Sequence, residues 1–136
     1  MSNKYVKILE EVLDEIKLSL EDPRGMQIHK RRLAFSLSLG ASTLIESYFY
    51  NKEILKSGAK INHQWLNKSL DNLKEILSNQ IICSMGELKE LDSLLELAQK
   101  IEEKRNIIIY GKEFSEDLLK DLINLFFKLK EIVENA

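Results

Sequence analysis

Cysteine, proline and long apolar runs are scarce in this sequence, which has one cysteine and one proline in 136 residues. Because Cys83 is alone, an intrachain disulfide and a cysteine-based zinc cluster are excluded, and a reducing, intracellular location is favoured. No apolar run approaches the roughly 20 residues that a membrane helix needs. Residues 1–20 alternate charged and apolar side chains, unlike the apolar centre of a signal peptide. We therefore expect a soluble, cytoplasmic protein without a membrane contact.

The chain also lacks an excess of one charge. Its 20 Lys and Arg residues stand against 22 Asp and Glu residues, for a formal net charge of -2. This balance excludes a general electrostatic attraction to nucleic acid, so RNA binding requires a local basic patch. Residues 29–32, together with Arg24, form one such patch. It is either a contact for RNA or an acidic partner, or the solvated face of a helix.

Histidine is equally rare, since His29 and His63 are the only two. They lie far apart in the chain and neither has a second ligand at helical spacing, so we expect no metal site. The sequence has no glycine-rich phosphate loop, and no nucleophile stands beside a base. We therefore expect no cofactor, and the sequence gives no support to an enzyme acting on small molecules.

Amphipathic helices account for most of the chain. The composition is 44% hydrophobic and 31% charged, with only five glycines, which is typical of a helical globule and not of a disordered chain. Apolar residues recur at three- and four-residue steps. This spacing predicts helices over residues 5–20, 27–56, 65–78, 88–110 and 115–133. Pro23 ends the first helix, Gly58 ends the second, and Ser115 caps the last.

The length is that of one domain, residues 1–136, with enough residues to bury a core. We expect an all-α, up-and-down bundle of four or five helices. The second helix has so wide an apolar face that it should lie in the centre, and Gly40, Ala41 and Ser42 should let a neighbour approach closely. Residues 107–109 are three isoleucines that could form a strand. We expect helix there, because the sequence offers no second strand for pairing.

A polar cluster at the end of the fourth predicted helix is the candidate site. Arg105 and Asn106 are adjacent, and Tyr110 follows four residues after Asn106. Asn106 and Tyr110 share a helix face, while Arg105 lies about 140° around the axis from Tyr110. If two copies of this helix met, their guanidinium groups could bind phosphate in one cleft. Alternatively, Arg105 pairs with Glu102 or Glu103, and Tyr110 packs its ring and donates to a carbonyl.

The order of the five helices and the stretch from Arg105 and Asn106 to Tyr110 and Gly111 resemble the HEPN superfamily. The motif of that family is an Arg, four to six residues, and a His, commonly with a polar residue directly after the Arg. The resemblance covers most of the chain, from residue 1 to about residue 133. It rests on one short motif together with the order of the helices.

The resemblance implies a homodimer, or an asymmetric pair, that acts as a metal-independent endoribonuclease. Arg105 would hold the scissile phosphate and stabilise its negative charge, with Asn106 at the polar position. Tyr110 stands where the family has its histidine. A tyrosine hydroxyl ordinarily ionises only near about pH 10, so it is a poor base at neutral pH. It can still donate a hydrogen bond or a proton to the leaving oxygen.

The resemblance also implies a partner. Many HEPN proteins act with a minimal nucleotidyltransferase as a toxin and antitoxin, and in one subgroup a tyrosine two residues after the His is nucleotidylated. Lys112 occupies that position here, which leaves Tyr110 as the alternative target. A hypothesis of another class is a non-catalytic helical module that dimerises or binds a partner. Replacement of Arg105 distinguishes the two, because only the first predicts a loss of RNA cleavage.

Overall fold

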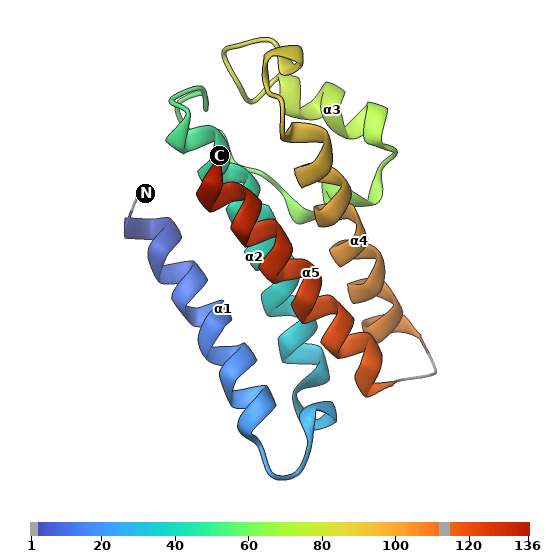
Figure 1. Ribbon diagram of the computed structural model, residues 1–136. Helices are drawn as coiled ribbons and strands as arrows, with labels where there is room; N and C mark the ends of the chain where they lie inside the picture. Colours follow the sequence, from blue (N-terminus) through green and yellow to red (C-terminus); the bar gives the residue numbers. More distant parts are fainter. Residues whose placement is uncertain (1–2, 112–114) are drawn as a thin grey trace.

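The computed structural model in Figure 1 describes residues 3–111 and 115–136. The α-helices in this part of the chain are α1 (Asn3–Glu21), α2 (Lys30–Asn51), α3 (Leu70–Ser78), α4 (Leu91–Tyr110) and α5 (Glu116–Asn135). Short 3-10 helices are η1 (Met26–His29), η2 (His63–Asn67) and η3 (Met85–Glu87). The expected all-α bundle is confirmed. None of the described helices is both long and apolar enough to cross a membrane.

Helix α2 is the centre of the bundle, as its wide apolar face predicts. It packs against α1, α4 and α5; α1 and α4 run antiparallel to α2, and α5 runs in the same direction as α2 (Figure 1). Residues 40–49 of α2 are all buried. Gly40 is the point of closest approach to α5, because a Cβ atom there would lie 2.6 Å from Cε1 of Phe126. The expectation that a small residue admits a neighbouring helix is therefore confirmed for Gly40.

The end of α2 corrects one prediction from the sequence. The helix ends at Asn51, not near residue 56, and Glu53 adopts a left-handed backbone with φ of 60°. The chain then forms an isolated antiparallel bridge between Leu55 and Ile81. Gly58 is also left-handed, with φ of 77°, but it belongs to a later turn. Pairing with the distant segment at Ile81 ends the helix early, and a local sequence pattern does not contain that information.

The third predicted helix, over residues 65–78, is also wrong in detail because it is two elements. The 3-10 helix η2 ends at Asn67, and Ser69 then caps α3 by accepting a hydrogen bond from the backbone N–H of Asn72 at 3.2 Å. The fourth helix begins at Leu91 instead of residue 88. Its helical path through residues 107–109 is confirmed. The break before Ser69 leaves η2 free to pack across α4.

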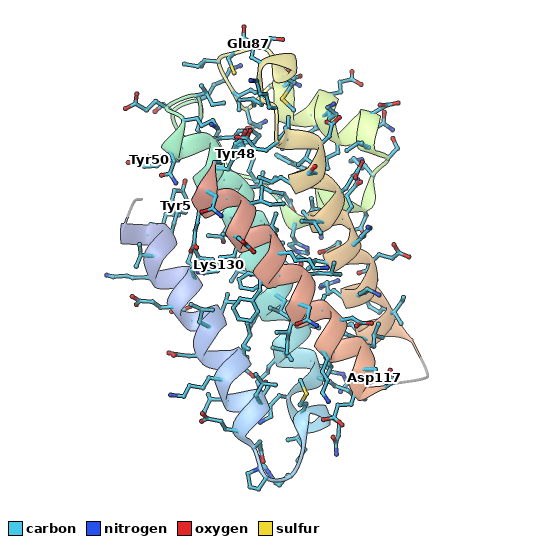
Figure 2. The ribbon with its side chains drawn as sticks, in the orientation of Figure 1. Tyr5, Tyr48, Tyr50, Glu87, Asp117 and Lys130 are labelled. Carbon is cyan, nitrogen blue, oxygen red and sulfur yellow. The ribbon has the colours of Figure 1, made fainter. Side chains whose placement is uncertain are left out.

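A buried carboxylate anchors the segment that leads into η2. Glu46 of α2 accepts a hydrogen bond from the backbone N–H of Ile61 at 2.9 Å. Tyr5 of α1 lies beside it, and burial followed by its hydrogen bond to Glu46 raises the Tyr5 pKa. The Tyr5 ring meets Tyr50 edge to face, with centroids 5.5 Å apart, near the end of the bundle that holds both termini (Figure 2). These contacts fix the start of η2 relative to α2.

Candidate functional site

The three candidate residues of α4 line one cavity. Arg105, Asn106 and Tyr110 form one wall of a space of about 460 Å³, and residues 63, 64 and 67 of η2 form the other. Arg105 is only 7% exposed, whereas Tyr110 is 75% exposed at the rim. The structure therefore brings the three sequence-predicted residues to one place, at different depths.

Arg105 uses one of its terminal nitrogens for all of its polar contacts. Nη1 donates to Oδ1 of Asn106 at 2.9 Å and lies 3.8 Å from Oε1 of Glu102. The guanidinium carbon lies 4.9 Å from the ring centroid of Phe35 on α2. The buried Nε has no hydrogen-bond partner in the part of the chain that the structure describes. The Nε and Nη2 edge, which forms a fork suited to an oxyanion, therefore makes no hydrogen bond to the described chain, although Nε itself is buried.

The alternative to a phosphate site was that Arg105 forms a structural ion pair and that Tyr110 packs its ring and donates to a carbonyl. The structure agrees with this alternative for Arg105 and not for Tyr110. Arg105 does approach Glu102, although at 3.8 Å, while Glu103 is exposed and makes no ion pair with Arg105. Tyr110 neither buries its ring nor forms a hydrogen bond within residues 3–111 and 115–136. A purely structural role therefore fits part of what Arg105 does but leaves Tyr110 unexplained.

Glu102 lines the cavity and is the carboxylate that the surrounding polar side chains contact. It is only 1% exposed, and a buried carboxylate is stable only when its oxygens are paired. Ser38 of α2 donates to Oε2 at 2.6 Å. The other oxygen, Oε1, lies 3.2 Å from Nδ1 of His63 and 3.8 Å from Arg105. One carboxylate thus connects α2, η2 and α4.

His63 is held in a defined orientation at the start of η2. Asn62 caps this element by accepting from the backbone N–H of Gln64 at 2.9 Å, and Leu66 anchors it in the core. Nδ1 of His63 must carry the proton that it shares with Glu102, because a carboxylate can only accept. In the neutral ring Nε2 then carries the lone pair. With its side chain 37% exposed in the cavity wall, His63 is a base within reach of a ligand.

His63 is not among the site residues predicted from the sequence, because no second metal ligand lies near it in the chain. The residue lies 39 positions from Glu102, and η2 is too short to show a periodic pattern. One signal was present in the sequence. Arg105 continues the apolar stripe of α4, four residues after the buried Ile101, and Glu102 lies four residues after Ala98. Two charges on a buried stripe require partners from another element.

A second cavity of about 520 Å³ continues the first along α4. The two share Asn67 and Asn106, whose side chains are joined by a hydrogen bond of 2.7 Å from Nδ2 of Asn106. Further along, Gln99 donates to the carbonyl oxygen of Lys68 at 2.7 Å. The surface between η2 and α4 therefore has two adjoining hollows, spanned by the Asn106–Asn67 hydrogen bond, which we call together the groove; His63 and Arg105 line one of them.

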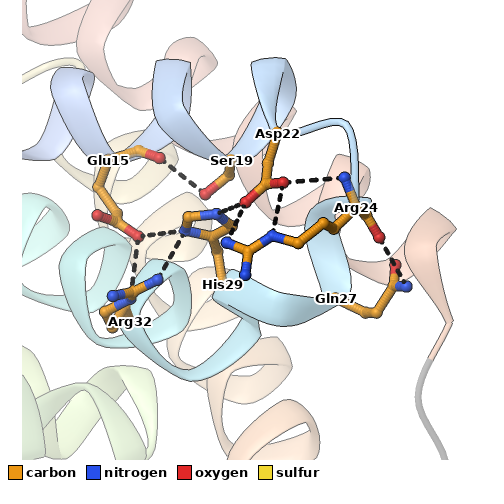
Figure 3. A network of polar contacts seen from close by, with 7 residues as sticks. All are labelled: Glu15, Ser19, Asp22, Arg24, Gln27, His29 and Arg32. Atoms are coloured by element: carbon orange, nitrogen blue, oxygen red, sulfur yellow. Dashed lines mark hydrogen bonds and ion pairs between the residues drawn. The ribbon is translucent and has the colours of Figure 1, made fainter.

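The other histidine belongs to a separate network at the junction of α1 and α2 (Figure 3). Nε2 of His29 lies 2.7 Å from Asp22, and Nδ1 lies 3.3 Å from Glu15 and 3.0 Å from Nη2 of Arg32. Arg24 also binds Asp22, at 2.8 Å. The Arg24 side chain, then its backbone N–H and then His29 hold the pKa of Asp22 well below its usual range. Arg24 and His29 of the basic patch predicted from the sequence thus contact carboxylates, as does Arg32, whose Nε lies 3.7 Å from Oε1 of Glu15.

The described residues contain no group of three or more His, Cys, Asp or Glu side chains placed to hold a metal ion. Lys112, the position compared with a modified tyrosine, lies outside the described residues. Comparisons with protein families, curated proteins and solved structures gave no match. The described residues thus form an all-α bundle in which the buried Glu102 and Arg105 and the partly exposed His63 form a cluster beside the groove.

Proposed function

We propose that the groove binds single-stranded RNA and cleaves a phosphodiester bond without a metal ion. The observation that supports this most directly is the buried Nε of Arg105, which is unpaired among the described residues. Its guanidinium group is fixed by Asn106 and Phe35, and its buried Nε lacks a partner within the described chain. A phosphate oxygen at that edge would satisfy a donor whose burial otherwise costs about 1–3 kcal/mol.

The neighbouring side chains suit the same substrate. Asn106 holds Arg105 on one side and Asn67 on the other, so the phosphate site is organised before the substrate arrives. Tyr110 stands at the rim, where its hydroxyl can donate to the leaving oxygen. Glu102 offsets much of the charge of Arg105, so attraction to phosphate depends on geometry more than on net charge.

This proposal places the chain among HEPN-like ribonucleases of the toxin–antitoxin type, with a minimal nucleotidyltransferase as the partner. Support for a homodimer comes from α2, where Phe35 and Leu39 expose about half of their surface, at 51% and 47%. Phe35 also contacts Arg105. Pairing of this surface with a second copy would bury both apolar side chains next to the cavity.

The test is cleavage of a mixed-sequence single-stranded oligoribonucleotide in buffer that contains a chelator. We expect the wild type to cleave it, and Arg105→Lys to cleave at least about 10²-fold more slowly because the fork is lost while the charge remains. Arg32→Lys, in the His29 network, is the matched control and should cleave like the wild type. No cleavage by the wild type, or equal rates for Arg105→Lys, contradicts the proposal.

A second candidate function is a non-catalytic dimerisation module, which the exposed Phe35 and Leu39 favour. It predicts that the wild type forms a dimer and leaves the oligoribonucleotide intact. Leu39→Asp should then make the chain monomeric in light scattering. A monomeric wild type at micromolar concentration would remove this candidate, since the module acts only as a pair.

A further inference from the structure

We propose that His63, from outside the motif stretch, is the general base of this site and that Glu102 is its positioning residue. The inference rests on the proposed RNA cleavage and adds the group that accepts the proton. Tyr110, at the position where the motif resemblance places a histidine, is a poor base. His63 lines the same cavity as Arg105 and Tyr110. The motif stretch therefore supplies the phosphate site, and η2 supplies the proton acceptor.

The geometry around His63 is that of an oriented imidazole. Nδ1–H of His63 donates a hydrogen bond to Oε1 of Glu102 at 3.2 Å, which leaves the lone pair on Nε2 in the neutral ring. Ser38 holds the other oxygen of Glu102 at 2.6 Å, so the carboxylate cannot turn away. Within residues 3–111 and 115–136, the charged or titratable groups that share the cavity with His63 are Glu102, Arg105 and Tyr110, all from α4. No second histidine or cysteine lines this cavity.

The reaction balances with these groups alone. Nε2 of His63 takes the proton of the ribose 2′-hydroxyl, and the 2′-oxygen forms a bond to phosphorus while Arg105 binds the non-bridging oxygens. The bond from phosphorus to the 5′-oxygen breaks, and that oxygen leaves with the bonding pair and takes a proton from the Tyr110 hydroxyl. The products are a 2′,3′-cyclic phosphate and a 5′-hydroxyl. Proton transfer from the His63 imidazolium to the Tyr110 phenolate through water restores both groups.

The surrounding structure separates this role from a structural one. His63 keeps about a third of its side chain exposed, and its only hydrogen bond within the described chain is to Glu102. A histidine that served only to pair with Glu102 need not line a cavity. His63 does line one, and Arg105 lines the same cavity. Asn106 joins η2 to α4 through Asn67, which holds His63 and Arg105 at a constant separation.

The test compares His63→Gln with His29→Gln on two probes. One is the cleavable oligoribonucleotide, and the other is its uncleavable 2′-O-methyl form, used to measure binding. We expect His63→Gln to bind the second probe with unchanged Kd and to cleave the first about 10²–10⁴-fold more slowly. The wild-type rate should rise with pH through the range in which imidazole loses its proton, and His63→Gln should lose that rise. His29→Gln should keep both the rate and the profile.

Glu102→Gln tests the positioning role by a spectroscopic signature. Nitrogen NMR of the wild type should show the Nδ1–H tautomer of His63, and Glu102→Gln should convert it to the Nε2–H tautomer with a fall in kcat and little change in KM. If His63→Gln cleaves like the wild type while Arg105→Lys does not, this inference is wrong and the proposed function stands. If the wild type does not cleave RNA at all, both are wrong.

Discussion

Each of the two histidines of the chain lies in a cluster that also contains a carboxylate and an arginine. The clusters differ in how many of the imidazole nitrogens have a polar contact. His29 has contacts on both ring nitrogens and a side chain only 9% exposed. His63 has a contact on Nδ1 alone and lines a cavity. An imidazole with both nitrogens engaged can only hold elements together, whereas one with a free nitrogen can accept a proton from a ligand. We therefore assign structure to the first and chemistry to the second.

The carboxylates of the two clusters differ in the same direction. Asp22 and Glu15 lie at the end of α1, and their side chains are 9% and 18% exposed. Glu102 is 1% exposed in the middle of the bundle. Arg24 bonds Asp22 from the surface, while Arg105 is itself buried beside Glu102. The His63 cluster thus contains two buried charged groups, Glu102 and Arg105. Burial of a charge destabilises the folded protein unless the charge is paired, so these groups depend on each other and on their hydrogen bonds.

Removal of the central carboxylate should have the largest effect on stability. Glu102→Ala leaves Arg105 as a buried charge without its counterion and should lower the free energy of unfolding by about 3–5 kcal/mol. Glu15→Ala, in the other cluster, should change it by less than about 1 kcal/mol because the pair with Arg32 is partly exposed. Urea unfolding of both variants measures the difference. Equal losses would mean that the two clusters are energetically alike.

Replacement of each histidine sharpens the assignment. His29→Ala removes the Nε2–H donor of Asp22 and the Nδ1 acceptor of Arg32, and should lower the free energy of unfolding by about 1–3 kcal/mol without affecting RNA cleavage. His63→Ala leaves Oε1 of the buried Glu102 without its hydrogen-bond donor, so it should also lower the free energy of unfolding by about 1–3 kcal/mol, but it should in addition slow RNA cleavage. Urea unfolding and the cleavage assay, measured on both variants, separate the two roles. Loss of cleavage in His29→Ala, or normal cleavage in His63→Ala, would reverse our assignment of roles.

The His29 cluster should contribute to the decrease in the free energy of unfolding at acidic pH. The hydrogen bond from Arg24 lowers the pKa of Asp22 in the folded protein below the usual value of about 3.9. Its stabilising contribution is fully present above that usual value and is lost as the pH falls toward the lowered, folded pKa, because the unfolded chain binds the proton more readily. Asp22→Asn should make the free energy of unfolding less dependent on pH in this acidic range. If Asp22→Asn left the pH dependence of the free energy of unfolding unchanged in this range, Asp22 would be excluded as its cause.

The smallest effect on stability is expected at the cavity rim. Tyr110→Phe removes a hydroxyl from a side chain that is 75% exposed, so the free energy of unfolding should change by no more than about 0.5 kcal/mol. RNA cleavage should nevertheless slow, because the leaving oxygen loses its proton donor. Thermal unfolding and the cleavage rate, measured on the same preparation, separate the two effects. An unchanged cleavage rate would remove Tyr110 from the reaction.

The fold was largely predictable from the sequence, because the bundle follows from apolar periodicity that each helix carries by itself. The stripe of α5 and the cap at Ser115 are local features, and both occur where expected. The end of α2 was not predictable, since it depends on pairing between Leu55 and Ile81. Contacts across such distances leave no mark on local spacing.

The half of the candidate site that lies on α4 was predictable from the sequence, and the half that lies on η2 was not. Arg105, Asn106 and Tyr110 are close in sequence and therefore appear together on one helix. His63 reaches Glu102 only because Glu46 anchors the incoming chain at Ile61 and the break at Ser69 separates η2 from α3. The sequence did contain the warning that Glu102 and Arg105 occupy a buried stripe of α4. Buried charges of this kind indicate that a partner must come from elsewhere in the chain.

The most direct test of the difference between the two clusters is a carbon–proton NMR titration of the imidazole rings. The chain has only two histidines, so the spectrum contains two sets of ring signals, which His29→Gln and His63→Gln assign. Addition of the 2′-O-methyl oligonucleotide should shift the His63 signal and leave the His29 signal in place. A shift of His29 alone, or of neither ring at saturating oligonucleotide, would contradict the assignment of the groove at His63 as the RNA site.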